Sequence, residues 1–390
     1  MFCEAPIAAC RAAATMIKLA LSRATLLFMV LTLTACVERG EIRLVPEARG
    51  VGRVESVYIG TSRGADLIEG ETFGQTRQRD LRYARIDVSI PPDRAPGEIA
   101  WPRKGRAADP TKQFVAVDQT LYTAASGFRD DLRRAFSTRN GGRSDAIIFI
   151  HGFNNTFAEG TYRMAQLGHD LKVDAVLVHY SWPSRASPLG YVYDRDSALF
   201  ARDGLEELIE EVAQAGAQHV TIVAHSMGSA LAMEAMRQMR IGGKDGALAR
   251  INGVLLMSPD MDVDVFHEAA VRIGTLPQPF IIFTSKKDRA LALSARLTGQ
   301  HDRVGNLANP EELGDLKVTL IDTTAFSTGA GHFNVANSPA LLSILGNIAK
   351  VDAAFSDDQT GRAGLLGGVV LSVQNVTQII MSPVSAIAQQ

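Results

Sequence analysis

Short apolar runs alternate with amphipathic segments through the second half of the chain. From residue 145 onward the apolar runs are rich in β-branched side chains, and several of the segments between them carry apolar residues at helical spacing. The predicted strands are DAIIFI (145–150), VDAVLV (173–178), HVTIVA (219–224), INGVLLM (251–257), PFIIF (279–283) and LKVTLI (316–321). Strands of this kind, separated by helices, form parallel sheets covered on both faces. The pattern therefore predicts the α/β class, with a mostly parallel central sheet and helices on both faces.

The first half of the chain predicts three further strands and one helix. Residues 54–64 and 81–91 alternate apolar and polar side chains, and residues 114–122 fit a third strand. Residues 126–137 have helical spacing, and Ser126 is the expected N-cap of that helix. A loop rich in Pro and Gly separates the second strand from the third.

One core domain is expected over residues 51–350, because α/β chains of this length often keep a single core. Residues 36–50 are charged and contain a proline and a glycine, which is typical of a linker. The tail, residues 351–390, begins as a polar loop and ends in an apolar stretch broken by Gly, Gln and Asn. These interruptions favour packing of the tail on the domain, and contact with a membrane is the alternative.

The N-terminus predicts a targeting segment that takes no part in the fold. Positive charges at Lys18 and Arg23 precede an apolar run that ends in the tetrapeptide Leu-Thr-Ala-Cys at Cys36. The run is short for a membrane span. The tetrapeptide resembles the lipobox of bacterial lipoproteins, in which the signal peptide, here residues 1–35, is removed and the cysteine is lipidated. A plain secretory signal and a membrane anchor are the alternatives.

This resemblance implies a protein anchored in the bacterial cell envelope by a lipid on Cys36, so the membrane is one expected partner. Val37 follows the cysteine, and under the sorting rule of lipoproteins a residue other than aspartate implies the periplasmic face of the outer membrane. The other cysteines, Cys3 and Cys10, precede the cleavage site. The mature chain would then contain no disulfide and no cysteine metal site.

Composition narrows the classes of function. The 390 residues are 46% apolar and 21% charged, as in ordinary globular proteins, and the formal net charge of -2 argues against a nucleic-acid partner. The local basic cluster Arg77, Arg79, Arg82 and Arg85 is expected to be a solvated face rather than an anion site. The sequence has no zinc-type spacing, P-loop or dinucleotide fingerprint, so neither a metal nor a cofactor is expected.

Polar clusters follow the predicted strands directly. They are HGFNN (151–155), HYSWPS (179–184), AHSMG (224–228), SPDMD (258–262), SKKD (285–288) and GAGHF (329–333). In parallel sheets, ligands bind beyond the carboxyl ends of the strands. We therefore expect these clusters to converge on one edge of the sheet and to form the functional site.

Ser226 is the candidate nucleophile. It lies between the strand VTIV and a helix of small residues, in the sequence Ala-His-Ser-Met-Gly (224–228). This matches the strand–turn–helix motif G-x-S-x-G, except that the first glycine is an alanine, which is still small enough for strand and helix to approach closely. In such a turn the serine oxygen is exposed, and the start of the helix favours negative charge beside it. A merely buried turn serine is the alternative.

A nucleophilic serine needs a base and an acid that orients the base. His332 is the candidate base, because it lies in a Gly-rich turn after the last predicted strand. Asp288 is the candidate acid, and Asp260 and Asp262 compete for the role; the carboxylates could instead cap helices. The chain order serine, Asp288, His332 is the order found in α/β-hydrolases.

Two backbone N–H groups are the candidate oxyanion hole, those of Met227 and Phe153. The side chain of Asn154 could assist in the pocket or could simply cap its loop. Trp182 and Tyr191 either line a substrate pocket, which would favour apolar or aromatic acyl groups, or form a structural clasp. Only about twenty residues separate SPDMD from FIIF. This leaves no room there for a large lid domain and favours esters of modest size.

The combined motifs resemble a bacterial α/β-hydrolase family of uncharacterised function over about residues 54–350. They are IFIHGFNNTF, HYSWPSRASPLGYVYDRD, VTIVAHSMGS, SPDMDVDVF, SKKDRAL and GHFN. The resemblance implies the α/β-hydrolase fold and the triad, and it leaves the substrate open. We expect a serine hydrolase that cleaves a small-molecule acyl ester through an acyl-enzyme; thioesters and amides would use the same machinery. The alternative is a non-catalytic envelope lipoprotein that binds a partner through this fold. The sequence does not predict the oligomeric state.

Overall fold

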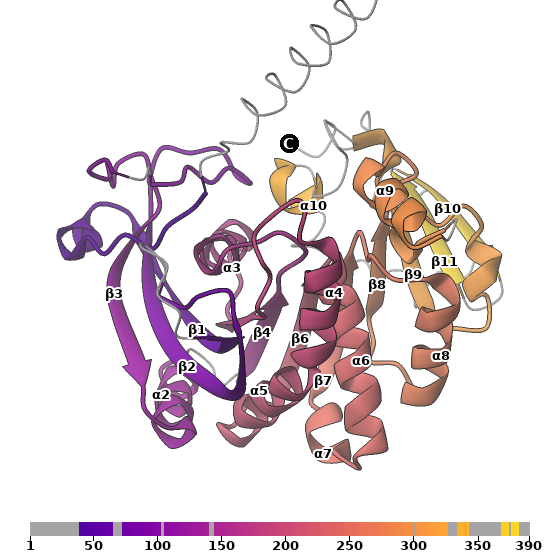
Figure 1. Cartoon of the computed structure of the whole chain (residues 1–390), viewed down its shortest axis with the longest axis horizontal. Coiled ribbons are helices and arrows are strands. Elements are labelled where there is room, and N and C mark those ends of the chain that lie inside the picture. The colour runs from indigo at the N-terminus through magenta and orange to yellow at the C-terminus, as the bar shows by residue number, and fades with distance from the viewer. Residues whose placement is uncertain are drawn as a thin grey trace, which may run out of the picture. The chain divides into compact units, whose positions relative to one another are not determined.

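The computed structural model describes most of the predicted domain (Figure 1). It describes residues 39–64, 72–102, 105–139, 144–299, 302–326, 334–339, 341–342, 368–373 and 376–381. The chain divides into two compact units, Met1–Arg39 and Gly40–Gln390. The expected signal peptide, Cys36 and His332 lie outside the described residues. The lipid anchor and its place in the envelope therefore stay predictions.

An eleven-stranded sheet forms the centre of the second unit, in the order β10-β11-β9-β8-β7-β6-β4-β5-β1-β2-β3. The strands are β1 Arg53–Arg63, β2 Arg77–Ile90, β3 Val115–Tyr122, β4 Asp145–Ile150, β5 Val176–Ser181, β6 His219–His225, β7 Ile251–Met257, β8 Phe280–Thr284, β9 Val318–Asp322, β10 Gly368–Val373 and β11 Val376–Met381. Every neighbouring pair from β11 to β1 is parallel. The pairs β1–β2, β2–β3 and β10–β11 are antiparallel. The predicted α/β class with a mostly parallel sheet is confirmed.

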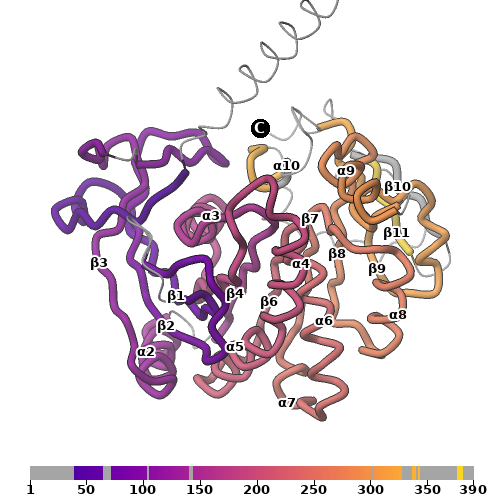
Figure 2. Tube along the Cα trace, viewed as in Figure 1, coloured from indigo at the N-terminus to yellow at the C-terminus, as the bar shows by residue number. Residues whose placement is uncertain are grey.

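Helices cover both faces of this sheet (Figure 2). They are α2 Ala125–Ser137, α3 Phe157–Leu171, α4 Tyr191–Phe200, α5 Arg202–Gln214, α6 Met227–Ile241, α7 Asp245–Leu248, α8 Val263–Ile273, α9 Arg289–Leu297 and α10 Asn334–Asn337, with short 3-10 helices η1 Pro46–Gly50, η3 Val304–Asn306, η4 Pro310–Leu313 and η5 Thr324–Phe326. Side chains alternate between the two faces of a strand. In β4, Ile148 and Ile150 belong to the core cluster that holds residues of α2, α5, α6 and α8, and Phe149 belongs to the cluster that holds those of α3.

The structure differs from the sequence prediction at two helix boundaries. The sequence of residues 194–215 is amphipathic, which predicts helical structure there, but the structure divides this segment between two helices, since α4 ends at Phe200 and α5 begins at Arg202. Ser126 does not cap α2, because the helix already begins at Ala125 and its N-cap residue, Ala124, makes no side-chain bond. Both differences concern single residues at helix ends, which local patterns define poorly.

The segments on either side of the expected domain contribute to its packing. Residues 40–50, predicted to be a linker, pair with β3, where the Val45 N–H donates to the Ala116 carbonyl at 2.7 Å. At the other end, β10 and β11 lie in the predicted tail, and β11 pairs in parallel with β9. Strand pairing, rather than loose packing, therefore joins this part of the tail to the sheet.

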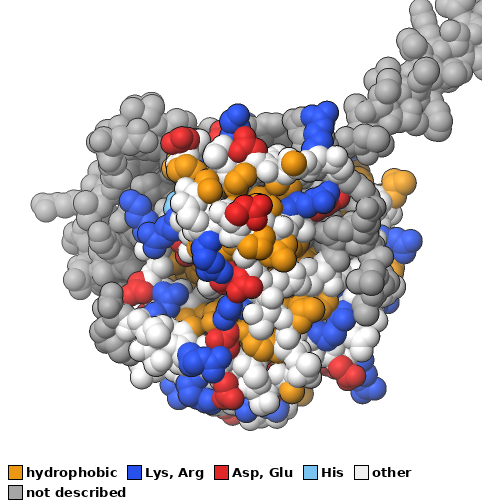
Figure 3. Space-filling view, turned by 90° about the vertical axis from the view of Figure 1, so that its left-hand side faces the viewer, with side chains coloured by type: hydrophobic (Ala, Val, Ile, Leu, Met, Phe, Trp, Pro, Cys, Tyr) orange, Lys and Arg blue, Asp and Glu red, His pale blue; other side chains and the backbone are white. Residues whose placement is uncertain are grey.

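The basic cluster lies on β2, and Arg77, Arg82 and Arg85 have hydrogen-bond partners. Arg85 donates to Asp131 at 2.7 Å and lies 3.4 Å from Asp87. Arg77 donates to the hydroxyl of Ser197 at 2.9 Å. Figure 3, which faces the side of β1 to β3, shows acidic and basic side chains interspersed rather than one basic field. In the described part of the chain, no helix has both the length and the apolar character needed to cross a membrane.

Candidate active site

Ser226 occupies the sharp turn between β6 and α6, with φ 53° and ψ −124°. An L-residue in such a sparsely populated backbone conformation costs about 1–3 kcal/mol and persists only where the surroundings impose it. Here the Ser226 N–H donates to the Met257 carbonyl at 2.9 Å, and the Ser226 carbonyl accepts from the N–H groups of Ser229 and Asp260 at 2.9 and 3.2 Å. The turn therefore has the strained strand-to-helix geometry of the motif, although Ser226 is only 2% exposed, which differs from the expected exposed serine oxygen.

Two glycines let the turn after β4 lie directly against the turn of Ser226. A Cβ at Gly228 would lie 2.4 Å from the His151 carbonyl oxygen, which is backbone and cannot move aside. A Cβ at Gly152 would lie 2.9 Å from the Cβ of Ser226. Because neither site tolerates a side chain, the backbone of residues 151–153 is held close to the serine.

This contact places the two predicted oxyanion donors on adjoining segments. Met227 is the first residue of α6, so its N–H has no acceptor within the helix. The N–H groups of Asn154 and Asn155, which follow Phe153, donate to Asp194 and Ser184. Across the described residues, by contrast, the N–H groups of Phe153 and Met227 make no hydrogen bond. Both donors are therefore available to a ligand.

A buried carboxylate, Asp194 of α4, holds the loop that follows Phe153. Its Oδ2 accepts from the Asn154 N–H at 3.1 Å and from the Ser184 hydroxyl at 2.6 Å, and its Oδ1 accepts from the Arg185 N–H at 2.6 Å. Burial raises the pKa of Asp194 above its usual value. Asn154 itself has φ 58° and therefore adopts a left-handed turn conformation. The site thus depends on a carboxylate that the sequence prediction did not single out as a site residue.

A buried guanidinium, Arg63 at the end of β1, holds the same loop from another side. It donates to the Asn155 carbonyl at 2.9 Å, the Ser181 hydroxyl at 2.8 Å and the carbonyls of Gly74 and Ser184, each at 3.2 Å. Arg63 is only 1% exposed. The signal in the sequence was a charged residue that directly follows an uncharged run, residues 56–62, at the end of the strand.

Trp182 packs beneath this loop and does not line a cavity. It is fully buried, its ring stacks on His151 with the centroids 4.8 Å apart, and its indole N–H donates to the His151 carbonyl at 2.7 Å. This corrects the prediction that Trp182 lines the substrate pocket. The reason is that Trp182 directly follows β5 and lies against the turn after β4, so its large ring fills space inside the fold.

His151 and His179 form a buried pair that must stay neutral. Their rings lie 5.6 Å apart, and both side chains are completely buried. Burial, followed by the nearby charge of Arg63, lowers the pKa of His151 to about 3. Burial and the neighbouring His151 also lower the pKa of His179 well below its usual value. Protonation of either ring therefore opposes folding.

We expect the free energy of unfolding of His179→Gln to fall less steeply in mild acid than that of the wild type. Below about pH 6.5 the unfolded chain takes up a proton at each histidine, whereas the folded chain does not, so each site lowers the free energy of unfolding as pH falls. The slope is at most about 1.4 kcal/mol per pH unit for each site. Urea unfolding from pH 8 to pH 5 measures it. Above pH 7 the free energy of unfolding should change equally with pH in the variant and in the wild type. If the two slopes were also equal below pH 6, the prediction would be wrong.

Asp288 and Asp260, the two candidate acids, differ in their surroundings. Asp288 follows β8, is 2% exposed and caps α9 through one oxygen, Oδ1, which accepts from the N–H groups of Ala290 and Leu291 at 3.0 Å each. Asp260 is engaged through both oxygens, because Oδ2 accepts from Tyr191 at 3.0 Å and Oδ1 accepts from Ser294 at 2.5 Å.

Asp260 is also part of a buried ion pair. The Arg303 Nε lies 3.4 Å from Oδ1 of Asp260, and both side chains are more than nine-tenths buried. This network leaves both oxygens of Asp260 held by structural partners. Asp288 as the acid stays a prediction. The candidate base, His332, lies outside the described residues and stays a prediction.

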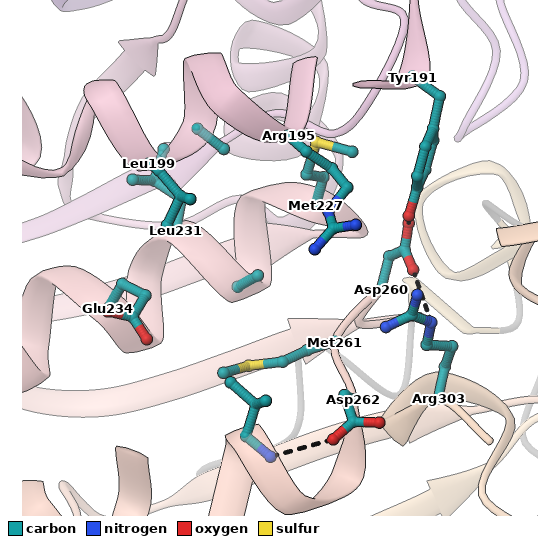
Figure 4. A pocket seen from close by; sticks show the side chains of 13 residues that line it. Tyr191, Arg195, Leu199, Met227, Leu231, Glu234, Asp260, Met261, Asp262 and Arg303 are labelled. Carbon is teal, nitrogen blue, oxygen red and sulfur yellow. Dashed lines mark hydrogen bonds and ion pairs between the residues drawn. The ribbon is translucent and has the colours of Figure 1, made fainter. Parts of the chain in front are cut away.

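Tyr191 lines a cavity beside the turn of Ser226 (Figure 4). Met227 also faces this cavity, so the space adjoins one of the oxyanion donors. The Tyr191 ring meets the ring of Phe153 edge to face at 5.4 Å, and burial raises the pKa of its hydroxyl to about 12. The prediction that Tyr191 faces a pocket agrees with this position. Asn154 does not line the cavity.

The fold is that of an α/β-hydrolase, and the strained turn of Ser226 fits this class. The chain belongs to the family described as "Alpha/beta hydrolase of unknown function (DUF900)", which matches residues 126–347, more than half of the chain. The predicted resemblance to α/β-hydrolases is thereby confirmed, and membership of the family supports a hydrolase.

Solved structures that resemble the chain are distant. An inhibited esterase B from Lactobacillus rhamnosis shares 14% identity over 65% of this chain and 85% of its own, with a TM-score of 0.32. Lipase B from Aspergillus fumigatus shares 17% identity over 57% of this chain and 49% of its own, with a TM-score of 0.26. Likenesses at this distance carry no conclusion about activity. No curated protein matches the sequence significantly.

Proposed function

We propose that this chain is a serine hydrolase that cleaves carboxylic esters of small molecules through a covalent acyl-enzyme. The observation that carries the proposal is the backbone of Ser226, held at φ 53° and ψ −124° between β6 and α6. Nothing in the packing of a sheet requires this strain, and strained residues of this kind cluster at active sites. In the proposed triad, Ser226 is the nucleophile, His332 the base and Asp288 the acid.

The reaction would proceed in two balanced steps. In the first, Ser226 Oγ attacks the ester carbonyl carbon while His332 accepts the hydroxyl proton, and the N–H groups of Met227 and Phe153 stabilise the oxyanion. The bond to the alcohol then breaks, and the imidazolium returns its proton to that alcohol. In the second step, water loses a proton to His332, attacks the acyl-enzyme and releases the carboxylic acid, and Ser226 recovers its hydroxyl hydrogen.

The two oxyanion donors and the cavity support an ester or a closely related acyl group as the substrate. A tetrahedral intermediate needs N–H donors aimed at the developing negative charge, and one such donor in a hydrolase contributes about 3–4 kcal/mol to transition-state stability. The first three residues of the loop after β4 lie against Ser226 because of Gly152 and Gly228. Thioesters and amides use the same machinery, and esters are the class with which the proposal is tested first.

A fluorophosphonate probe tests the proposal directly. We expect the folded wild-type protein to form one covalent adduct with the probe, which loses fluoride in the reaction. Mass spectrometry should locate the adduct on the peptide that contains Ser226. Protein unfolded in urea should not react, because the triad is then dispersed. A folded protein that stays unlabelled, and that cleaves no ester in a panel of acyl chains, would refute the proposal and favour a non-catalytic binding protein.

A further inference from the structure

The cavity beside Met227 has the size of a small acyl group. Its volume is about 180 Å³, and apolar side chains from α4, α6 and the segment before α8 form its walls, among them Leu199, Leu231 and Met261. Pockets for drug-sized ligands measure roughly 300–1,000 Å³. Because Met227 also carries an oxyanion N–H, an acyl chain attached to Ser226 can extend into this space.

Each carboxylate that faces the cavity already has a partner. Asp260 lies 3.4 Å from Arg303, and Glu234 lies 3.8 Å from Arg237. Asp262 caps α8, where its Oδ1 accepts from two backbone N–H groups (Figure 4). The negative charges around the cavity are thus balanced by a nearby guanidinium or by the start of a helix.

Arg195 is the exception among the charged side chains of the cavity. It comes from α4, and Figure 4 shows its guanidinium pointing into the space between the walls. Within the described part of the chain, no hydrogen bond or ion pair engages it, whereas Arg303 has Asp260 and Thr298. A guanidinium is planar and can donate two parallel N–H hydrogen bonds to the two oxygens of a carboxylate.

We propose that Arg195 makes this site selective for esters whose acyl part ends in a free carboxylate. The inference rests on the proposed esterase function and names its substrate class. The scissile carbonyl would lie at Ser226 and Met227, the short methylene chain would run along the apolar walls, and the terminal carboxylate would bind Arg195. Because Arg195 is exposed, water screens this charge pairing, which therefore contributes as an exposed ion pair does.

Matched pairs of aryl esters test this inference. The 4-nitrophenyl monoesters of succinic and glutaric acid are compared with the butanoate and pentanoate esters, which have the same chain lengths and no charge. For the wild type we expect kcat/KM to be about 2- to 5-fold higher for the charged member of a pair, the range that an exposed ion pair contributes. The preference should shrink as salt is added, because Arg195 is exposed.

Arg195→Gln should bring the ratio of charged to neutral ester close to one. Arg202→Gln is the matched control, since Arg202 is an exposed arginine at the start of α5 and does not line the cavity. It should keep the wild-type ratio. Equal rates for both members of a pair in the wild type, or a preference that survives Arg195→Gln, would overturn the inference and leave the esterase proposal intact. Failure to cleave any ester, without labelling by fluorophosphonate, would refute both.

Discussion

Replacing Ser226 by alanine is expected to lower kcat for ester hydrolysis by about 10⁶-fold, because a triad without its nucleophile retains only binding and oxyanion stabilisation. KM should change little, and labelling by fluorophosphonate should disappear. Steady-state kinetics with 4-nitrophenyl esters measures the loss, and burst-phase kinetics shows whether an acyl-enzyme still forms.

Ser258 provides a matched control for this variant. It follows β7, is buried and also has a positive φ of 46°, so Ser258→Ala imposes the same kind of change at a similar turn. That variant should stay labelled and active.

His332→Ala tests the proposed base in the same experiment. The effects of residues that act as one unit are not additive, so the double variant with Ser226→Ala should be no slower than Ser226→Ala alone. Wild-type rates in Ser226→Ala would refute the proposed mechanism.

Replacing Asp288 by asparagine is expected to lower kcat by about 10⁴-fold, since an amide in place of the acid leaves the base in the wrong tautomer. The fold should tolerate the change. Asparagine caps helices about as well as aspartate, so its side-chain oxygen can still accept from the N–H groups of Ala290 and Leu291. The expected signature is therefore a large loss of kcat with a nearly unchanged free energy of unfolding.

Asp260→Asn should give the opposite signature. This change breaks a buried ion pair with Arg303, and removal of one partner from such a pair costs about 3–5 kcal/mol of stability. Activity per folded molecule should fall far less than in Asp288→Asn. Urea unfolding and kinetics on both variants separate the two roles, and a 10⁴-fold loss of kcat confined to Asp260→Asn would transfer the acid role to Asp260.

The nucleophile turn was predictable because its geometry is local. A β-branched strand, small residues two positions before and after the serine (Ala224 and Gly228) and an immediate helix all occur within about ten residues, and the structure places φ 53° at that serine. The strands β4 to β9 were predictable for the same reason, since apolar runs report burial of both faces. Helix ends were less predictable from the sequence, as Ser126 and the break between α4 and α5 at Ala201 illustrate.

The partners of the site residues were not predictable, because they come from distant parts of the chain. Arg63 donates to the carbonyl of Asn155, which is 92 residues away, and Trp182 stacks on His151, 31 residues away. A pattern along the sequence contains no information on which side chains meet across strands. For that reason the sequence left Trp182 open between a pocket wall and a structural clasp, and its burial against His151 favours the clasp.

The sequence by itself determined the class of fold, the strained turn of Ser226 and the strand ends where the functional groups gather, because periodicity and turn chemistry act over a few residues. Only the tertiary structure decided that the predicted tail pairs with β9, that Arg63 and Asp194 hold the loop of Phe153, and that Arg195 faces the cavity with no hydrogen bond or ion pair to another described residue. These features depend on strand order and on packing between segments far apart in the chain, which no local pattern specifies.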